Sequence, residues 1–398
     1  MNILVALCAV GAEKILGNEI KHLGYKLAGG EDTKNAGLRG RVAFYGDDDA
    51  LFRANLCLRT ADRVYLQLAS YNATDFDQLF DGAYTIPWQD FLRKDSRIVV
   101  DKVRTRKSKL NSEHSVQGIV HKAIYSKLGD VWHMASLPES GEQSDVRVYL
   151  DDNQVSVLLD LSGLPLHKRG YRADGGTAPL RETTAAILLQ ELMWRRKTAL
   201  HDPFCGSGTI AIEAALYAHN VSPGFARKFA VENLPFFDKK KAIEIRRKEA
   251  EKIRTDVEPR ITGSDIDFEA VERAKKNAEH ACAAADYALR EIGADARILR
   301  PKFYQSDFSD LTAPYESGIL LCNPPYGERL GDDEEACALY RRMGGLWDAF
   351  SGWDIGIITA NEHFQSNFGH RTGAIKKLKA GNLDTSLYIY TRSKNQGK

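Results

Sequence analysis

The sequence predicts an α/β protein with a doubly wound parallel sheet in its C-terminal part and a smaller α+β region before it. The first observation is length, because 398 residues are too many for one typical core. After residue 170, apolar strand patterns alternate with amphipathic helix patterns, whereas before it the two are mixed without regular alternation. We therefore place the boundary between the two regions near residues 165–175.

Composition excludes several classes of protein. The chain is 43% hydrophobic and 27% charged, as ordinary globular proteins are, and its net charge of +1 means that basic patches must be found by position. The six cysteines form no Cys-x-x-Cys pair and no zinc spacing, so we expect a reducing cytoplasm and no metal. The apolar start at Ile3–Val10 lacks a basic leader, and no other stretch is apolar enough to span a bilayer, so we expect no membrane partner.

In the N-terminal region the patterns predict short strands and helices that end in a closing hairpin. We expect strands near 3–10, 26–27, 41–44, 64–68 and 98–103, the hairpin strands at 146–150 and 154–161, and helices at 12–23, 49–59 and 115–127, with a further helical stretch bracketed by 76–81 and 88–92.

In the C-terminal region strands and helices alternate. We expect strands at 198–204, 260–264, 298–304, 318–322 and 354–360, helices at 181–195, 209–219, 268–281 and 334–350, and a terminal antiparallel pair at 375–378 and 386–390. Between the first strand–helix unit and the next strand lies Lys239–Arg254, which has eight basic and three acidic residues. We interpret it as an inserted, solvated helix, and a partner-binding role is the alternative.

The most informative motif is Asn323-Pro324-Pro325-Tyr326, which follows the apolar run Gly318–Cys322. The prolines fix the backbone and remove N–H donors, so the segment is stiff and presents acceptors beside an aromatic ring. Two acceptors and one ring suit a planar group with an exocyclic amine, such as a nucleobase. The motif therefore predicts a base-binding, catalytic site at these four residues.

A second set of residues predicts a nucleotide-type pocket at the carboxyl ends of successive strands. Glycines allow a ligand to approach the backbone closely, and acids can hold ribose hydroxyls or an adenine amine. The expected cofactor-binding residues are Asp202, Pro203, Phe204, Gly206, Gly208 and Thr209 after the first strand, Asp265 and Ile266 after the next, Asp307 and Phe308 after the third, and Asn323. Taken singly, Asp267 and Asp307 would be explained as helix caps. The ordered set predicts a site for S-adenosylmethionine.

These residues resemble the class I methyltransferase set, and Leu321–Leu330 is similar to its amino-methylating branch. Leu164–Arg172 and Ala178–Thr183 resemble the entry to the catalytic domain in bacterial THUMP-domain RNA methyltransferases, of which the 23S rRNA guanine-N2 group is the most similar. The resemblance implies a Rossmann-like methyltransferase domain at 166–398, in which Pro179 and Thr183 help to close the cofactor pocket. It also implies a ferredoxin-like segment at 1–60, completed by strands near 150–162, and a THUMP domain at 61–160.

We expect this protein to lack the second methyltransferase half that some relatives carry, so the resemblance implies no 7-methylguanine activity. The expected reaction is an in-line attack of a guanine N2 lone pair on the sulfonium methyl. Asn323 and the Pro324 carbonyl would accept the two N–H bonds and Tyr326 would stack on the base. Cys322 and Cys205 are interpreted as packing residues.

Basic residues predict where RNA binds. One group has five cations within eight positions that contain no acid, and we expect it to contact RNA phosphates. A second group of three is expected to contact the RNA backbone near the target base, which must leave its stack to be methylated. They are Lys102, Arg104, Arg106, Lys107 and Lys109, and then Lys168, Arg169 and Arg172. For the first group, a solvated loop is the alternative.

Several functions remain open. The same acceptor array would serve adenine N6 in DNA, although a THUMP-like front end favours RNA. The sequence distinguishes poorly between a guanine-N2 enzyme that acts on tRNA and one that acts on rRNA. A non-catalytic RNA-binding assembly factor is a further alternative. The sequence favours a monomer without fixing the oligomeric state.

Overall fold

The computed structural model describes residues 1–29, 39–172, 180–325, 333–380 and 383–392. The chain forms two compact units. The N-terminal unit comprises Met1–Cys8, Leu16–Leu166 and Lys228–Ile245, and the C-terminal unit comprises Ala9–Ile15, His167–Arg227 and Arg246–Lys398. Each unit is built around its own seven-stranded sheet.

The sheet of the N-terminal unit has the strand order β2-β3-β1-β4-β7-β6-β5. Its neighbouring strands are antiparallel except β5 and β6, which are parallel. The β6–β7 pair confirms the predicted closing hairpin. The strands are β1 (Asn2–Leu7), β2 (Lys26–Leu27), β3 (Arg41–Gly46), β4 (Arg63–Asn72), β5 (Arg97–Arg106), β6 (Gln143–Asp151) and β7 (Gln154–Asp160).

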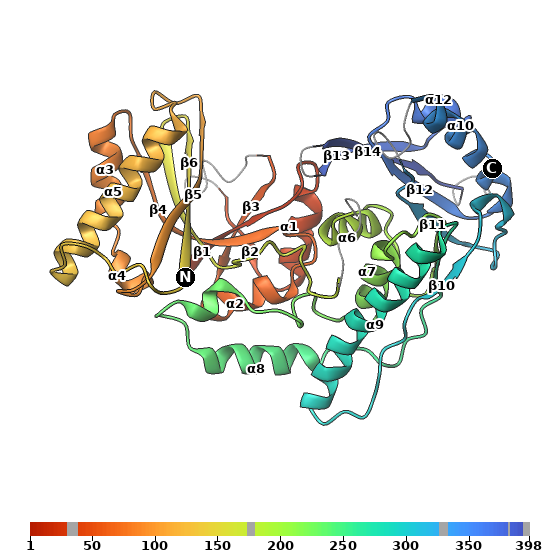
Figure 1. Cartoon of the computed structure of the whole chain (residues 1–398), viewed down its shortest axis with the longest axis horizontal. Helices are drawn as coiled ribbons and strands as arrows, with labels where there is room; N and C mark the ends of the chain where they lie inside the picture. Colours follow the sequence, from red (N-terminus) through yellow and green to blue (C-terminus); the bar gives the residue numbers. More distant parts are fainter. Residues whose placement is uncertain (30–38, 173–179, 326–332, 381–382, 393–398) are drawn as a thin grey trace. The chain divides into compact units, whose positions relative to one another are not determined.

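Helices α3 and α5 pack together and contact β4 and β5 (Figure 1). Aspartate and serine caps fix where these helices begin: Asp75 accepts from the Gln78 N–H at 2.8 Å and Ser112 from the Ser115 N–H at 3.2 Å. The helices of this region are α1 (Glu13–His22), α2 (Asp48–Cys57), α3 (Phe76–Tyr84), α4 (Trp88–Phe91) and α5 (Glu113–Trp132). The predicted helices at 12–23, 49–59 and 115–127 are therefore confirmed, whereas the single helical stretch expected between 76 and 92 is divided into α3 and α4.

One segment of the N-terminal unit comes from much later in the sequence. We call Lys228–Ile245 the strap; it contains η2 (Ala230–Asn233) and the first part of α8 (Lys239–Ala250). Phe229 and Phe237 of the strap contact the ring of Phe52 at centroid distances of 5.4 and 5.8 Å, and the Val231 N–H donates to the Leu161 carbonyl at 3.0 Å. The predicted inserted helix is confirmed, and its first half belongs to the N-terminal unit.

The sheet of the C-terminal unit has the order β10-β9-β8-β11-β12-β14-β13. The first five are parallel, and β14 runs antiparallel to both of its neighbours. This confirms the doubly wound sheet and the terminal antiparallel pair. The strands are β8 (Ala199–Asp202), β9 (Ile261–Asp265), β10 (Lys302–Gln305), β11 (Gly318–Cys322), β12 (Asp354–Thr359), β13 (Ala374–Ala380) and β14 (Leu383–Tyr390).

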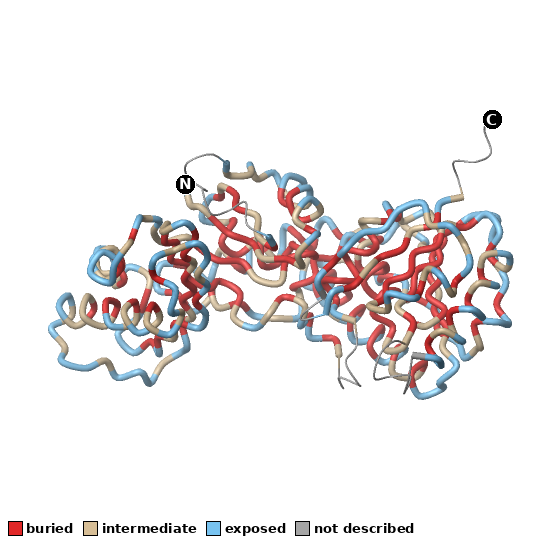
Figure 2. The backbone as a smooth tube through the Cα atoms, turned by 90° about the horizontal axis from the view of Figure 1, so that it is seen from above, coloured by how far each residue is buried: buried red, intermediate tan, exposed pale blue. Residues whose placement is uncertain are grey.

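Helices cover both faces of this sheet, which explains why β11, at its centre, is apolar and buried throughout. On one face α7 and α9 contact each other and β8 and β9, and on the other α10, α11 and α12 enclose a core that includes Leu320 and Ile355. Figure 2 shows the buried residues, in red, gathered in the interior and the exposed ones, in pale blue, around them. The helices are α6 (Glu182–Glu191), α7 (Thr209–Ala218), α9 (Phe268–Glu291), α10 (Asp333–Met343), α11 (Leu346–Ala349) and α12 (Phe364–Phe368). Among the described residues, no helix combines the length and apolarity that crossing a membrane requires.

Candidate active site

The loop between β8 and α7 requires glycine. Gly206 and Gly208 have φ angles of +50° and +82°, which L side chains rarely adopt. A Cβ on Gly208 would also lie 2.9 Å from the ring of Phe303 and 3.0 Å from the Cβ of Ala274, whereas around Gly206 the space is open. The backbone at Gly206 is therefore accessible to a ligand. Asn277 of α9 holds the loop by donating to the Ser207 carbonyl at 3.0 Å.

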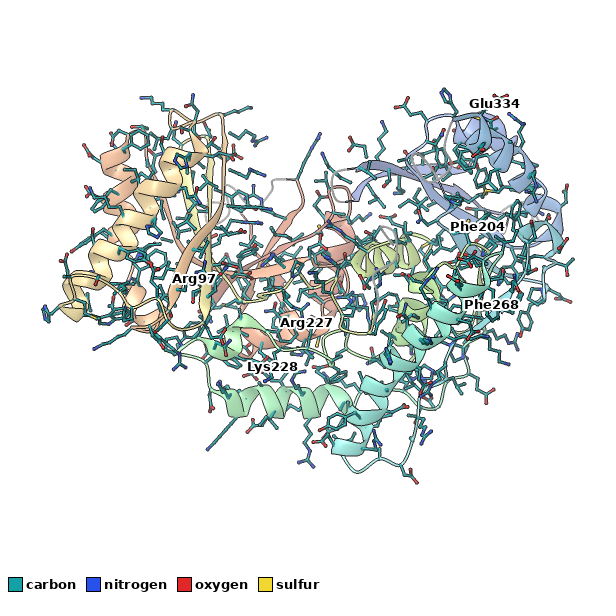
Figure 3. All side chains as sticks on the ribbon, in the orientation of Figure 1. Arg97, Phe204, Arg227, Lys228, Phe268 and Glu334 are labelled. Carbon is teal, nitrogen blue, oxygen red and sulfur yellow. The ribbon has the colours of Figure 1, made fainter. Side chains whose placement is uncertain are left out.

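The ends of β8 and β9 meet, as the parallel pairing of these strands requires. Asp265 Oδ2 accepts the Gly206 N–H at 2.9 Å, and Oδ1 accepts the Asp267 N–H at 3.1 Å. Ile266 and Phe268, which follow, expose 65% and 58% of their surface, unusually much for large apolar residues. Phe268 was not predicted as a site residue; it and Phe204 are labelled in Figure 3. A carboxylate beside exposed apolar surface suits a ribose with an attached base.

Asp202 places a second carboxylate beside the first. It is only 2% exposed, and its Oδ1 accepts the Phe204 N–H at 3.1 Å. Burial raises the pKa of Asp202 well above its usual value, and the charge of Asp265 raises it further. Neither acid forms an ion pair with any residue that the structure describes. A ligand that carries positive charge or N–H donors would therefore offset their desolvation and repulsion. Pro203 is buried beside them.

The carboxylate of Asp307, which follows β10, already has interaction partners within the protein. Asp307 begins η3 (Phe308–Asp310), accepts the Ser309 N–H at 2.9 Å and pairs with Arg342 of α10 at 3.2 Å. These interactions, the Ser309 N–H foremost, hold the pKa of Asp307 below its usual value. Asp267 likewise caps α9 by accepting the Glu269 N–H at 2.8 Å. The cap explanation is therefore correct for both acids, and it leaves Asp307 fewer free lone pairs for a ligand.

Two aromatic rings and a cation meet next to Asp307. The rings of Phe204 and Phe308 lie 5.0 Å apart, and the guanidinium of Arg342 lies 5.0 Å from the Phe308 ring. Arg342 was not predicted, because nothing in the sequence marks a contact between residues 35 positions apart.

Asn323 follows β11, which pairs with β8 on one side and β12 on the other. Its Oδ1 atom is buried and has no hydrogen-bond partner among the residues that the structure describes. Such an orphaned acceptor costs about 1–3 kcal/mol, which a bound N–H donor would offset. Pro324 is buried and Pro325 half-buried, so the segment is held in place. Tyr326, the fourth residue of the motif, lies outside the described residues.

The cysteines near the site are unsuited to nucleophilic catalysis. Cys322 and Cys205 are 0% and 5% exposed, and burial raises the pKa of each thiol far above its usual value. A thiol that stays protonated is inert. The interpretation of both cysteines as packing residues is confirmed.

The cations predicted at the domain junction differ in exposure. Arg169 is 2% exposed and pairs with Glu213 at 3.4 Å, so in this structure its guanidinium lies in the interior and not at a surface that RNA could contact. Arg172 also points inward: it donates to Thr209 Oγ1 at 2.8 Å and pairs with Glu182 at 3.0 Å. Only Lys168 is exposed.

Arg172 nevertheless lies next to the glycine loop, because the Thr209 to which it donates is the first residue of α7 and directly follows Gly208. Thr183 is buried in the first turn of α6, one residue after the Glu182 that pairs with Arg172. Pro179, the other residue expected to close the pocket, lies outside the described residues.

The basic run of the N-terminal unit lies partly on a strand. The predicted strand at 98–103 extends to Arg106, so Lys102, Arg104 and Arg106 belong to β5 and the expected loop begins later. Arg104 pairs with Glu113 at 2.8 Å and Arg106 with Asp151 at 2.8 Å. Lys102, Lys107 and Lys109 are exposed and form no ion pair with a described residue.

Comparison with protein families identifies three segments. Residues 169–389 match the model described as "RMKL-like, methyltransferase domain", residues 3–65 match "RlmL ferredoxin-like domain" and residues 73–160 match "THUMP domain".

Similar proteins cover nearly the whole chain. YpsC of Bacillus subtilis, named as a candidate RNA methyltransferase, is 38% identical over 97% of this chain and 95% of its own length. "Ribosomal RNA large subunit methyltransferase K/L" of Photobacterium profundum is 33% identical over 98% of this chain, which spans about half (53%) of that relative. The crystal structure of SMU.472, a candidate methyltransferase complexed with SAH, is 34% identical with a TM-score of 0.84 and covers 98% of both chains.

Proposed function

The chain belongs to the RMKL-like methyltransferase family, with an RlmL ferredoxin-like domain and a THUMP domain before the catalytic domain, and from this premise we propose that it methylates the exocyclic N2 amine of a guanine in large-subunit ribosomal RNA. S-adenosylmethionine is the cofactor. The observation that best supports amine methylation concerns Asn323, which follows the last residue of β11. Its Oδ1 atom is buried and accepts no hydrogen bond from any described residue.

The residues at the strand ends fit this cofactor. It supplies an electrophilic methyl group on a positively charged sulfur. Asp202 and Asp265, which have no cationic partner among the described residues, would accept from its amine and hydroxyl groups. The open space at Gly206 would let it approach the backbone, and Ile266 would cover an apolar ring.

Asn323 would orient the amine that is methylated. Its Oδ1 and the carbonyl of Pro324 accept the two N–H bonds of N2, so the nitrogen lone pair turns out of the base plane toward the methyl group. The lone pair would form the new N–C bond, and the electrons of the broken S–C bond would leave with the demethylated cofactor. The amine proton leaves afterwards to water or through Asn323. Catalysis then depends on orientation rather than on a strong base.

The target guanine must leave its stack to reach such a site, so an unpaired loop or an extruded base is the substrate conformation. Lys102, Lys107 and Lys109 would bind phosphates, because they are exposed and unpaired among the described residues, whereas Arg104 and Arg106 already neutralise carboxylates. Tyr326 would stack on the target base, and Lys168 would contact the neighbouring backbone.

A second candidate reaction is methylation of adenine N6, because two acceptors at Asn323 and Pro324 would serve that amine equally. The THUMP domain favours RNA as the substrate in either case.

Mass spectrometry of nucleosides from rRNA and tRNA of cells that lack the protein tests the proposal. We expect N2-methylguanosine to fall in 23S rRNA and to be unchanged in tRNA. Loss from tRNA alone would move the substrate to tRNA, and loss of N6-methyladenosine would establish the second candidate. If every methylated nucleoside is retained, the chain acts without turnover and the proposal is wrong.

A further inference from the structure

A cavity of about 530 Å³ lies in the N-terminal unit, where the starts of β5 and β6 meet the strap. Its volume is in the range of pockets that enclose small ligands. The charged side chains that line it are the cations Arg93, Arg97 and Lys239 and the acids Asp95, Glu142 and Asp160. Arg97 is labelled in Figure 3, as is Lys228 at the start of the strap.

Backbone hydrogen bonds hold the walls of this cavity in place. The Arg97 N–H donates to the Glu142 carbonyl at 3.1 Å, and the Gly141 N–H donates to the Asp95 carbonyl at 2.7 Å. Arg93 Nε donates to the Asn233 carbonyl of the strap at 3.0 Å, which leaves its other two nitrogens for a ligand. Asp160 is buried, pairs with Arg63 and accepts the Ser162 N–H at 2.8 Å, so its charge is already compensated.

The other charges of the cavity are not compensated. Arg97, Lys239, Asp95 and Glu142 are exposed, and none forms an ion pair with a residue that the structure describes. A simple anion would be attracted by the cations and repelled by the acids. A nucleotide matches both sets, because its phosphate suits the cations and the N–H groups on its base edge suit the carboxylates.

We propose that this cavity binds an unpaired nucleotide of the substrate RNA, other than the nucleotide that is methylated. Arg97 and Lys239 contact its phosphate, and Asp95 and Glu142 accept N–H groups of its base. The inference rests on the proposed function only in taking RNA as the ligand. It gives the strap a role, because Lys239, at the start of α8, and Asn233 come from the strap and complete the cavity.

Binding of a 5′-fluorescein-labelled, mixed-sequence single-stranded RNA octamer to the full chain tests the phosphate contacts by anisotropy. We expect Arg97→Ala/Lys239→Ala to weaken binding about tenfold at ~0.1 M salt, because two cations are lost. The matched control Lys94→Ala/Lys240→Ala removes the same charge from adjacent positions outside the cavity and should weaken it by no more than about twofold. Equal losses in the two variants would overturn the inference.

Substituting the two acids gives a second test, because attraction of a plain anion and recognition of a base predict opposite changes in RNA affinity. Asp95→Asn/Glu142→Gln keeps the shape and makes the cavity more positive, so attraction of a plain anion predicts tighter binding. Base recognition predicts that octamer binding weakens, by about threefold, because each charged carboxylate is replaced by a neutral amide with a single, weaker acceptor oxygen. Tighter octamer binding would exclude nucleotide recognition. Inorganic phosphate, titrated as a competitor, should compete better in this variant than in the wild type.

Methyl transfer is measured separately, so that the two proposals can fail independently. At saturating RNA, Arg97→Ala/Lys239→Ala should retain the wild-type kcat and show a raised KM. If the wild type methylates no RNA but octamer binding still depends on the cavity, the methylation proposal fails and the cavity proposal stands. If the wild type methylates RNA and the cavity variant has an unchanged KM, the cavity proposal fails alone.

Discussion

The backbone N–H of Gly206 donates to Oδ2 of Asp265 at 2.9 Å, which joins the glycine loop after β8 to the carboxylate after β9. Because Oδ1 accepts the Asp267 N–H as well, the carboxylate cannot rotate freely. Its remaining lone pairs are therefore fixed in direction before any ligand arrives.

We predict that Asp265→Ala weakens S-adenosylmethionine binding by about 10–100-fold, because a charge-assisted acceptor is worth about 1.5–3 kcal/mol. Isothermal titration calorimetry measures this. Asp267→Ala is the matched control: it removes a helix cap, costs about 1 kcal/mol of stability and leaves cofactor affinity nearly unchanged. Unchanged affinity in Asp265→Ala would mean that another carboxylate holds the cofactor.

For Asn323→Ala we expect methyl transfer to be lost while cofactor affinity stays close to that of the wild type, because the amide orients the base. The substitution also removes a buried acceptor without a partner among the described residues, so the free energy of unfolding should stay unchanged or rise by about 1 kcal/mol. Single-turnover assays and urea denaturation measure the two effects. Turnover at the wild-type rate would refute the proposed mechanism.

The paired and unpaired cations of the basic run should differ in their effect on RNA binding. Removing Lys102, Lys107 and Lys109 should lower the slope of log K against log salt by about 2, since each phosphate contact to a single strand contributes about 0.7. Arg104→Ala/Arg106→Ala should lower affinity less per charge, because each arginine already pairs with a carboxylate. A slope equal to that of the wild type in the lysine variant would show that these side chains are merely solvated.

His201, adjacent to Asp202, should make the folded state sensitive to acid. It is buried, its two ring nitrogens lie 2.8 Å from Thr262 Oγ1 and 3.2 Å from Ser264 Oγ, and burial lowers its pKa from 6.5 to about 4. Between these values the unfolded chain binds the proton and the folded chain does not. Stability therefore falls as the pH drops from 6.5 toward 4, by at most about 3 kcal/mol from this residue.

Urea denaturation at pH 7 and pH 5 measures the effect of His201. His201→Gln removes the titrating group, so its loss of stability over this interval should be smaller than that of the wild type. The same pH dependence in both proteins would mean that His201 is protonated in the folded state.

The sequence predicted the elements well, because strand and helix periodicity report burial directly. The helix at 209–219 and the strand at 318–322 are found as α7 at Thr209–Ala218 and β11 at Gly318–Cys322. The sequence was less informative about which charged side chains form ion pairs with one another. A run of cations gives the same pattern whether its members are solvated or paired, so the burial of Arg169 against Glu213 and the pairing of Arg106 with Asp151 could not be foreseen.

Long-range contacts were also beyond the sequence. The Arg342–Asp307 pair and the strap depend on how separate segments meet in three dimensions, and local periodicity carries no information about that. By contrast, the strand ends that form the candidate active site could be predicted, because parallel strands always bring their carboxyl ends to one edge.

The strap has a practical consequence for dissecting the molecule. Cutting after Leu166 would yield a C-terminal fragment in which Phe229, Val231 and Phe237 have lost the partners that bury them, and an N-terminal fragment in which Phe52 is uncovered. Both fragments would expose apolar surface that is buried in the whole chain, so both would tend to aggregate. Soluble halves would require transplanting residues 228–245 onto the first fragment and bridging the resulting gap in the second with a short flexible linker.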